Sequence, residues 1–319
     1  MAVAIQKMKK LLKVFAWLLA AVLVAGLATY LVMHASQEKL QVARLRAKAP
    51  GQFVHLPDGY VHYSLKGPGN GQPIVFIHGG GATGMEVWDK TIPALYNGQQ
   101  RVLAYDLYGR GFSDRPHVHY DADLYERQLV SLLDTLGFRG PVDVVAMSMG
   151  AAIAMQFTAH HPERVRKLVL LGPAASGDLR PSSLLSVPLL DRFLMTCYWY
   201  PRSIENQRKE FQNMPLFDTY SQRLRYFINI EGYKRITLST WHDMLNKSQL
   251  HFLAEVPPNK VLLVYGDSDP FFPPQKLDDY KKLYPTLVSQ KITSAGHMPH
   301  YEQPAQVNPL IRDFLGTGK

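Results

Sequence analysis

The stretch that decides the fold is VDVVAMSMGAAIAMQFTAH, residues 142–160. Its first six residues form an apolar run interrupted by one aspartate, which is typical of a strand buried on both faces of a sheet. Residues 149–160 contain no proline and are long enough for a helix. Between the two stands Ser148, with small residues on either side at 146 and 150. A tight strand-to-helix turn requires small residues because it brings neighbouring backbone close. The stretch therefore predicts a buried strand, a turn that exposes Ser148, and a helix.

Similar apolar runs recur on both sides of this stretch and alternate with segments of helical character. The predicted strands are residues 73–78, 101–106, 167–171, 260–265 and 291–294, and the further predicted helices are residues 124–136 and 304–315. Residues 53–56 and 60–65 flank a Pro-Asp-Gly turn, which predicts a hairpin. This alternation indicates an α/β fold with a mostly parallel central sheet and helices on both faces.

Residues 173–258 interrupt the alternation. They contain no convincing buried strand, and they are too long for a simple loop in a compact domain. Several Tyr, Trp and Met residues lie among them. We interpret this segment as a helical cap over a core formed by residues 53–172 and 259–319. The alternative is an ordinary helical subdomain that only packs against the core.

Residues 14–33, VFAWLLAAVLVAGLATYLVM, carry no charge. A helix of this length spans about 30 Å, which matches the hydrocarbon core of a bilayer. Trp17 and Tyr30 stand near its two ends, where amphipathic rings favour the membrane interface. The segment predicts one transmembrane anchor between a basic tail, residues 1–13, and a juxtamembrane stalk, residues 34–52.

A cleaved signal peptide is the alternative interpretation, because it shares a basic N-terminal region. Its apolar part is usually about 7–15 residues long and ends at a small-x-small site. Here the run is longer, and the candidate site at residues 33–35 begins with the large residue Met33. An uncleaved anchor is therefore favoured. The short tail favours an N-in orientation, with the body on the other side of the membrane.

The formal net charge of +9 does not indicate nucleic-acid binding. Residues 1–50 hold eight basic residues and one acidic residue, a sum of +7, which leaves only +2 for residues 51–319. The basic excess thus flanks the apolar segment, as it does around membrane anchors. We expect a membrane location and no nucleic-acid partner, and the oligomeric state stays open.

Three motifs follow the predicted strands. The first is AMSMG, residues 146–150, which resembles the G-x-S-x-G nucleophile elbow of the α/β-hydrolase superfamily, with alanine in place of the first glycine. The second is HGGG, residues 78–81, which is similar to the oxyanion loop of that superfamily. The third pairs GDSDP, residues 266–270, with AGHMP, residues 295–299, and gives the order Ser, Asp, His that these enzymes use. The resemblance covers residues 53–317.

This resemblance implies a catalytic triad with Ser148 as nucleophile, His297 as base and Asp269 as the acid that orients the base. The superfamily acid usually lies three residues after the glycine that ends the strand, which favours Asp269 over Asp267. His300 is the competing base. The resemblance also implies an oxyanion hole made by the N–H groups of Gly80 and Met149, with His78, Gly79 and Gly81 as supporting loop residues.

The implied chemistry requires no metal or cofactor, and the remaining histidines show no metal-ligand spacing. We expect a serine hydrolase that cleaves small carboxylic esters through an acyl-enzyme intermediate. The anchor keeps the site close to amphiphilic esters, so a lipid-like substrate such as a monoacylglycerol is expected, and the chain resembles membrane-anchored monoacylglycerol lipases.

Two alternatives stay open. Carbon–carbon bond hydrolases of aromatic degradation share the serine triad, but they commonly carry Trp after the histidine, where this chain has Met298. A membrane-tethered binding protein could keep the same fold without activity. Haloalkane dehalogenases and epoxide hydrolases are disfavoured, because these relatives use Asp in place of Ser148.

Overall fold

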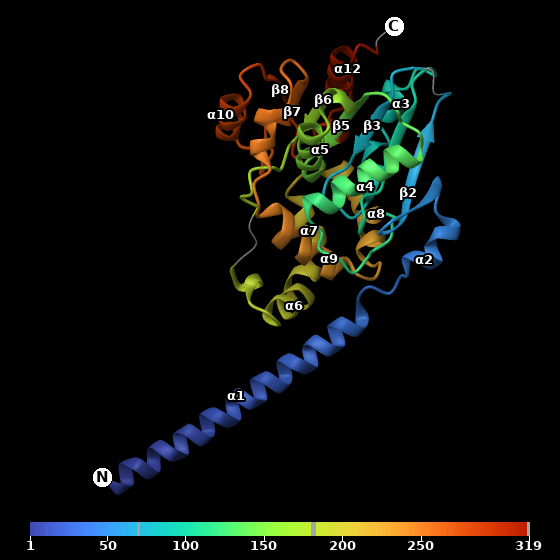
Figure 1. The fold of residues 1–319 in the computed structure, drawn as a ribbon. Helices are drawn as coiled ribbons and strands as arrows, with labels where there is room; N and C mark the ends of the chain where they lie inside the picture. Colours follow the sequence, from blue (N-terminus) through green and yellow to red (C-terminus); the bar gives the residue numbers. More distant parts are fainter. Residues whose placement is uncertain (69–70, 180–182, 318–319) are drawn as a thin grey trace.

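The computed structural model of the chain describes residues 1–68, 71–179 and 183–317. Within them, eight strands form one sheet in the order β1-β2-β4-β3-β5-β6-β7-β8 (Figure 1). The β1–β2 and β2–β4 pairs are antiparallel, and the other neighbouring pairs of this sheet are parallel. The strands are β1 (Gln52–Leu56), β2 (Gly59–Lys66), β3 (Ile74–Ile77), β4 (Val102–Tyr105), β5 (Val142–Met147), β6 (Val165–Leu171), β7 (Val261–Gly266) and β8 (Val288–Ile292). The predicted hairpin and the mostly parallel central sheet are confirmed.

The last strand differs from the prediction. β8 occupies residues 288–292, whereas the sequence predicted a strand at residues 291–294. β8 lies at the edge of the sheet and pairs only with β7 among the described residues. Most of its side chains are exposed, so it lacks the apolar run that marks a buried strand.

The helices cover both faces of the sheet, as predicted. The α-helices of the described residues are α1 (Ala2–Ser36), α2 (Val42–Leu45), α3 (Ile92–Leu95), α4 (Ala122–Thr135), α5 (Met149–His160), α6 (Leu190–Leu194), α7 (Ser203–Arg208), α8 (Met214–Ile228), α9 (Tyr233–Thr240), α10 (Pro274–Leu283), α11 (Pro299–Glu302) and α12 (Pro304–Leu315). Alternate side chains of β3 show the two layers. Val75 and Ile77 pack in the core that includes α4 and α5, whereas Ile74 and Phe76 pack in the core that includes α3, α8 and α12. Strand β5 lies between the same two layers, and helix α5 belongs to the first of them.

Helices α6 to α9 lie between β6 and β7, in the segment interpreted as a cap. No strand lies among the described residues of this segment. Turns of 3₁₀ and π-helix connect the helices, including the π-helical turn Met195–Trp199 that continues α6. Residues 180–182 of the predicted cap, and residues 69–70 and 318–319 of the predicted core, lie outside the described residues.

Helix α1 joins the predicted basic tail and the predicted apolar span into one continuous helix, Ala2–Ser36. It projects away from the body, which it meets only near its C-terminal end (Figure 1). The helix is long and apolar enough to cross a membrane, and its most apolar window is not buried by the rest of the chain.

The predicted stalk, residues 34–52, packs on the body near Leu40 and Val42. Val42 is only 7% exposed and packs in the same core as Phe227 and Ile230 of the cap segment. The Leu40 N–H donates to the Asn229 carbonyl at 3.0 Å, and the Leu40 carbonyl accepts from the next peptide along the cap. The sequence did not predict this contact, because single apolar residues in a polar segment show no periodicity.

Val42 should contribute measurably to stability because it buries an apolar side chain between the stalk and the body. Val42→Ala should lower the free energy of unfolding by about 1.5 kcal/mol, since burial of each CH₂ group contributes about 0.8 kcal/mol. Chemical denaturation of the detergent-solubilised chain measures the effect. The control is Val118→Ala, at an exposed position. Equal stability of the two variants would show that the stalk does not dock on the body.

Candidate active site

Ser148 lies in the turn between β5 and α5 with a φ of 53° and a ψ of −120°. A side-chain-bearing residue rarely adopts such a backbone conformation, and it persists only where the surrounding packing enforces it. Gly150 shows that packing directly. A Cβ atom at position 150 would lie 2.4 Å from the carbonyl oxygen of His78 and 2.5 Å from that of Ile77. The turn is therefore wedged against the end of β3, which holds the serine in place.

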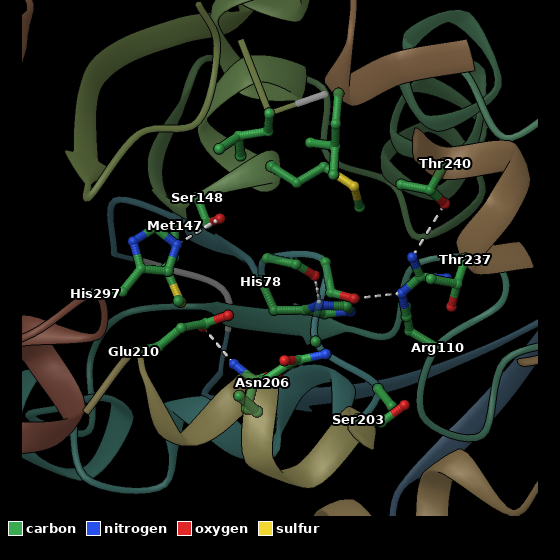
Figure 2. A pocket seen from close by; sticks show the side chains of 18 of the residues that line it. His78, Arg110, Met147, Ser148, Ser203, Asn206, Glu210, Thr237, Thr240 and His297 are labelled. Carbon is green, nitrogen blue, oxygen red and sulfur yellow. Dashed lines mark hydrogen bonds between the residues drawn. The ribbon is translucent and has the colours of Figure 1, made fainter. Parts of the chain in front are cut away.

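The structure brings the three predicted triad residues together. His297 Nε2 lies 2.8 Å from Ser148 Oγ, and His297 Nδ1 lies 2.9 Å and 3.0 Å from the two carboxylate oxygens of Asp269. Figure 2 shows the His297 ring facing Ser148 across the end of the sheet. The side chains follow β5, β7 and β8. All three residues are buried, so few water molecules compete for these hydrogen bonds. Such a chain can move a proton from the serine to the imidazole.

The two competing carboxyl groups occupy different environments. Asp269 also accepts hydrogen bonds from the backbone N–H groups of Phe271 and Phe272. Although burial raises the pKa of Asp269, the interaction with His297 and these N–H groups outweigh it and lower the pKa. Asp267 is turned to the backbone N–H groups of the β8–α11 loop, at 3.1 Å and 3.3 Å, and makes no contact with the imidazole. The geometry therefore pairs Asp269 with the histidine.

The two other histidines near the site have structural contacts. His300 is fully buried with its ring 4.5 Å from the ring of Trp88, and burial lowers its pKa to about 3. His78 Nε2 accepts a hydrogen bond from the Leu107 N–H at 2.9 Å. Burial lowers the pKa of His78 to about 4, so its ring is neutral at physiological pH. The structure brings neither ring into the triad.

The glycine-rich loop after β3 lies directly beside Ser148. A Cβ atom at Gly79 would lie 2.9 Å from Ser148 Cβ, so a larger residue would displace the serine. The Gly80 carbonyl accepts a hydrogen bond from Arg110 Nε at 2.8 Å, which fixes the orientation of that peptide. Gly80 and Met149 both line the cavity in front of Ser148. Their position is compatible with two N–H groups directed at a substrate oxygen, and that role stays a prediction.

A cavity of about 360 Å³ opens in front of Ser148. This volume lies in the range of small-molecule sites. Its core side includes residues 78–81, so the predicted loop residue Gly81 lies in its wall. Its cap side is largely aromatic and amide-bearing, and includes Met195, Trp199, Asn206, Glu210, Tyr233 and Trp241. Among the described residues, no group of three or more His, Cys, Asp or Glu side chains is arranged to hold a metal ion.

Two ionisable side chains of the cavity were not predicted as site residues. Arg110 reaches the cavity from the loop after β4, and its Nη2 donates to Thr240 Oγ1 at 3.1 Å. Glu210 projects towards His297 from the cap side (Figure 2). Its backbone carbonyl accepts a hydrogen bond from the His297 N–H at 2.8 Å. Burial raises the pKa of the Glu210 carboxyl to about 7. Glu210 lies in a segment without any motif, so the sequence carried no signal for it.

The charged groups around His297 and the burial of its ring act in opposite directions on the pKa of its imidazole. Burial lowers the pKa of His297, but the carboxylate of Asp269, and to a lesser extent that of Glu210, outweigh burial and raise it above the usual value. A raised pKa means that the neutral imidazole, which is the form that acts as a base, appears only at higher pH. The site should therefore gain activity as the pH rises above the usual histidine range.

Comparison with known proteins places the chain among hydrolases. A family model described as alpha/beta hydrolase fold matches residues 72–304. The 2-hydroxy-6-oxo-2,4-heptadienoate hydrolase of Pseudomonas putida is 28% identical over 274 residues, which cover 81% of this chain and 94% of the relative. The 2-hydroxy-6-oxononadienedioate/2-hydroxy-6-oxononatrienedioate hydrolase of Burkholderia vietnamiensis is 31% identical over 271 residues, which cover 80% and 90%. A solved meta-cleavage product hydrolase of Pseudomonas fluorescens has a TM-score of 0.66 at 22% identity and covers 84% of this chain and 98% of its own, which shows the shared fold.

These relatives overturn one prediction. The sequence led us to expect an ester hydrolase with a lipid-like substrate, but the curated relatives described above are named for 2-hydroxy-6-oxo acids. The alternative of a carbon–carbon bond hydrolase agrees better with these names. The sequence had favoured esters because Met298, and not Trp, follows the histidine, and because the apolar helix suggested a lipid-like substrate.

Substitutions at the two neighbouring acids separate their roles. Asp269→Asn should lower kcat by about 10⁴, because the carboxylate holds the imidazole in the productive tautomer. Asp267→Asn should keep most activity, since this carboxylate accepts its hydrogen bonds from two backbone N–H groups and from the Ser268 hydroxyl. Ser148→Ala should abolish both turnover and labelling by a fluorophosphonate probe. Circular dichroism checks that each variant is folded. A larger loss in Asp267→Asn than in Asp269→Asn would overturn the assignment.

The pH profile tests the influence of Glu210 on the base. In the parent chain, kcat/KM should rise with pH through a midpoint above 6.5, the usual pKa of histidine. Glu210→Gln removes a nearby anion that raises the pKa of His297, so the midpoint should move to lower pH. The matched control is Glu205→Gln, five residues earlier in the chain, where the glutamate side chain is 63% exposed. An unchanged midpoint in Glu210→Gln would contradict this electrostatic coupling.

Proposed function

Since the chain belongs to the α/β-hydrolase fold family and is similar to curated 2-hydroxy-6-oxo-dienoate hydrolases, we propose that it hydrolyses a carbon–carbon bond in a compound of that class. The observation that carries the proposal is the similarity to these relatives over four fifths of this chain. The hydrogen-bonded Ser148, His297 and Asp269 supply the chemistry that such a reaction needs.

The names of the relatives define the bond that must break. A 2-hydroxy-6-oxo-dienoate carries a carboxylate, an enol and a ketone, and it contains no ester or amide bond. Hydrolysis of such a compound must therefore break a carbon–carbon bond beside the ketone. The ketone carbon is an electrophile that an activated serine can attack, so the same triad serves this reaction.

The triad residues act in the following order in this proposal. His297 takes the proton of Ser148 as the serine oxygen bonds to the ketone carbon C6, and the ketone oxygen becomes an oxyanion. The N–H groups of Gly80 and Met149 stabilise that charge. Asp269 stabilises the imidazolium form of His297 and keeps the ring aligned.

Cleavage then requires a stable leaving group. Transfer of the enol proton to C5 gives a 2-oxo form of the substrate, in which the electron pair of the C5–C6 bond can spread into the conjugated ketone. As that bond breaks, the pair moves into a dienolate, which takes the proton from the His297 imidazolium and leaves as a 2-hydroxydienoate, so that His297 is neutral again. The acyl group remains on Ser148. Water, deprotonated by His297, then attacks the acyl-enzyme and releases a carboxylic acid and the free serine.

The cavity suits a small conjugated acid in two respects. Arg110 places a guanidinium at its wall, and a guanidinium is well suited to bind a carboxylate. Glu210 has a pKa raised to about 7, so a large part of it is uncharged near neutral pH and repels an anionic substrate less than an ordinary carboxylate. Aromatic side chains of the cap, including Trp199 and Trp241, supply surfaces for a planar diene. Residues 173–258 act in this proposal as the substrate-binding cap.

We also propose that α1 anchors the enzyme in a membrane. Its apolar window is unburied, and a lysine-rich stretch precedes it. In this arrangement residues 14–33 cross the bilayer and the hydrolase body lies on the side opposite to the N-terminus.

The direct test is turnover of 2-hydroxy-6-oxo-2,4-heptadienoate by the full chain in detergent or vesicles. The conjugated absorbance of the substrate should disappear, and mass spectrometry should show acetate and a five-carbon 2-hydroxydienoate in equal amounts. Ser148→Ala is the control for the nucleophile, and p-nitrophenyl acetate is the comparison substrate. Rapid hydrolysis of the ester with no cleavage of dienoates of this class would refute the proposal.

A further inference from the structure

The surface of the cap next to α1 is unusually apolar. Outside α1, eight large apolar side chains of the described residues are exposed, and four of them lie between positions 184 and 198. These four are Leu184, Val187, Leu189 and Tyr198, with exposed fractions of 54%, 47%, 76% and 49%. We call this set the cap apolar face. Single exposed apolar residues are common, but a cluster of this kind marks an interaction surface.

The cap apolar face is continuous with the membrane helix. Phe193 of α6 lies in contact with the last third of α1: its ring is 6.4 Å from that of Tyr30, and it is 3.9 Å from a Cβ built at Gly26. Gln37, just beyond the helix, donates to the Thr196 carbonyl at 3.0 Å. Figure 1 shows α6 on the side of the body that is nearest α1. These contacts hold the cap segment and the helix together.

The contact between Phe193 and α1 determines how deep the cap segment lies relative to the bilayer. If the bilayer core ends near Met33, Gly26 lies seven residues deeper, which is about 10 Å along a helix. Phe193 packs between Gly26 and Tyr30, so it lies below the level at which the hydrocarbon ends. The residues around it in the chain, Val187 and Leu189, are therefore brought to the membrane interface. Amphipathic segments at an interface typically bury about 5–10 Å into this boundary.

The polar groups around this contact agree with that depth. Lys39, just beyond the end of α1, is exposed, and a lysine at this end of the span can reach lipid headgroups. The guanidinium of Arg202 lies 4.0 Å from the ring of Tyr198, which places a cation and an aromatic ring together at the rim of the face. Both arrangements are favoured at membrane interfaces. A soluble protein partner would not explain why the cap apolar face lies next to the apolar helix α1. A bilayer explains both the exposed apolar side chains and their position beside this helix.

We propose that the cap apolar face is inserted in the same bilayer as α1 and forms a second membrane contact of the enzyme. This inference rests on the proposed anchoring by α1. The opposite side of the same helical run, with Met195 and Trp199, lines the catalytic cavity. The run is thus a wall between the lipid and the cavity, and the bilayer holds the substrate-binding cap at a fixed depth.

The test uses the full chain with Cys197→Ser, so that a single new cysteine can carry the fluorophore NBD. The chain is reconstituted in vesicles of phosphatidylcholine and phosphatidylglycerol, with or without doxyl-labelled lipid as quencher. Val187→Cys is matched by Val288→Cys on β8, because the two valines are 47% and 48% exposed. Leu18→Cys, in α1, reports on the anchor. Fluorophosphonate labelling of each chain verifies that it is folded.

The proposal predicts a blue-shifted emission at position 187 and loss of most of its fluorescence with doxyl lipid, with neither effect at 288. Leu189→Cys should behave as Val187→Cys does. Quenching at 18 without quenching at 187 or 189 would overturn the second contact and leave the anchor intact. Absence of quenching at 18 would overturn both, since the depth of the cap face is set by α1.

Discussion

The wedge between the Ser148 turn and the end of β3 is the constraint on which the site depends. Gly150 lies against the carbonyls of Ile77 and His78, and Gly79 lies against the serine itself, so the two loops fit only because neither carries a side chain there. This contact holds Ser148 at a positive φ. It also places the glycine-rich loop beside the nucleophile before any substrate binds. Geometry that is fixed in advance needs no reorganisation during the reaction.

The motifs at the ends of β3, β5 and β7 could be predicted because each combines a chemical residue with a backbone requirement. A serine between small residues, directly after a buried strand, permits few interpretations. The order of Ser148, Asp269 and His297 along the chain strengthened the prediction of a triad. The central strands could also be predicted, because burial on both faces leaves an unbroken apolar run in the sequence. β8 was misplaced because an edge strand is not required to be apolar.

The remaining features depend on contacts that leave no pattern in the sequence. Val42 is one apolar residue in a polar segment, and its burial follows from docking on the cap. The Glu210 carboxylate influences His297 because the fold brings two segments far apart in the chain together, as the hydrogen bond from the His297 N–H to the Glu210 carbonyl shows. The reaction itself was predicted incorrectly, because esterases and carbon–carbon hydrolases can share one triad, and the choice between them lies in the cavity and not in the motif.

The central claim is that Ser148 attacks a ketone and keeps the acyl fragment after the carbon–carbon bond breaks. Rapid acid quench during turnover of 2-hydroxy-6-oxo-2,4-heptadienoate, followed by peptide mass spectrometry, measures this directly. The account predicts an acetyl group on the peptide that contains Ser148, because C6 and C7 form the acyl fragment. Formation of products at full rate in a Ser148→Ala chain, with no acetylated peptide in the parent, would contradict it.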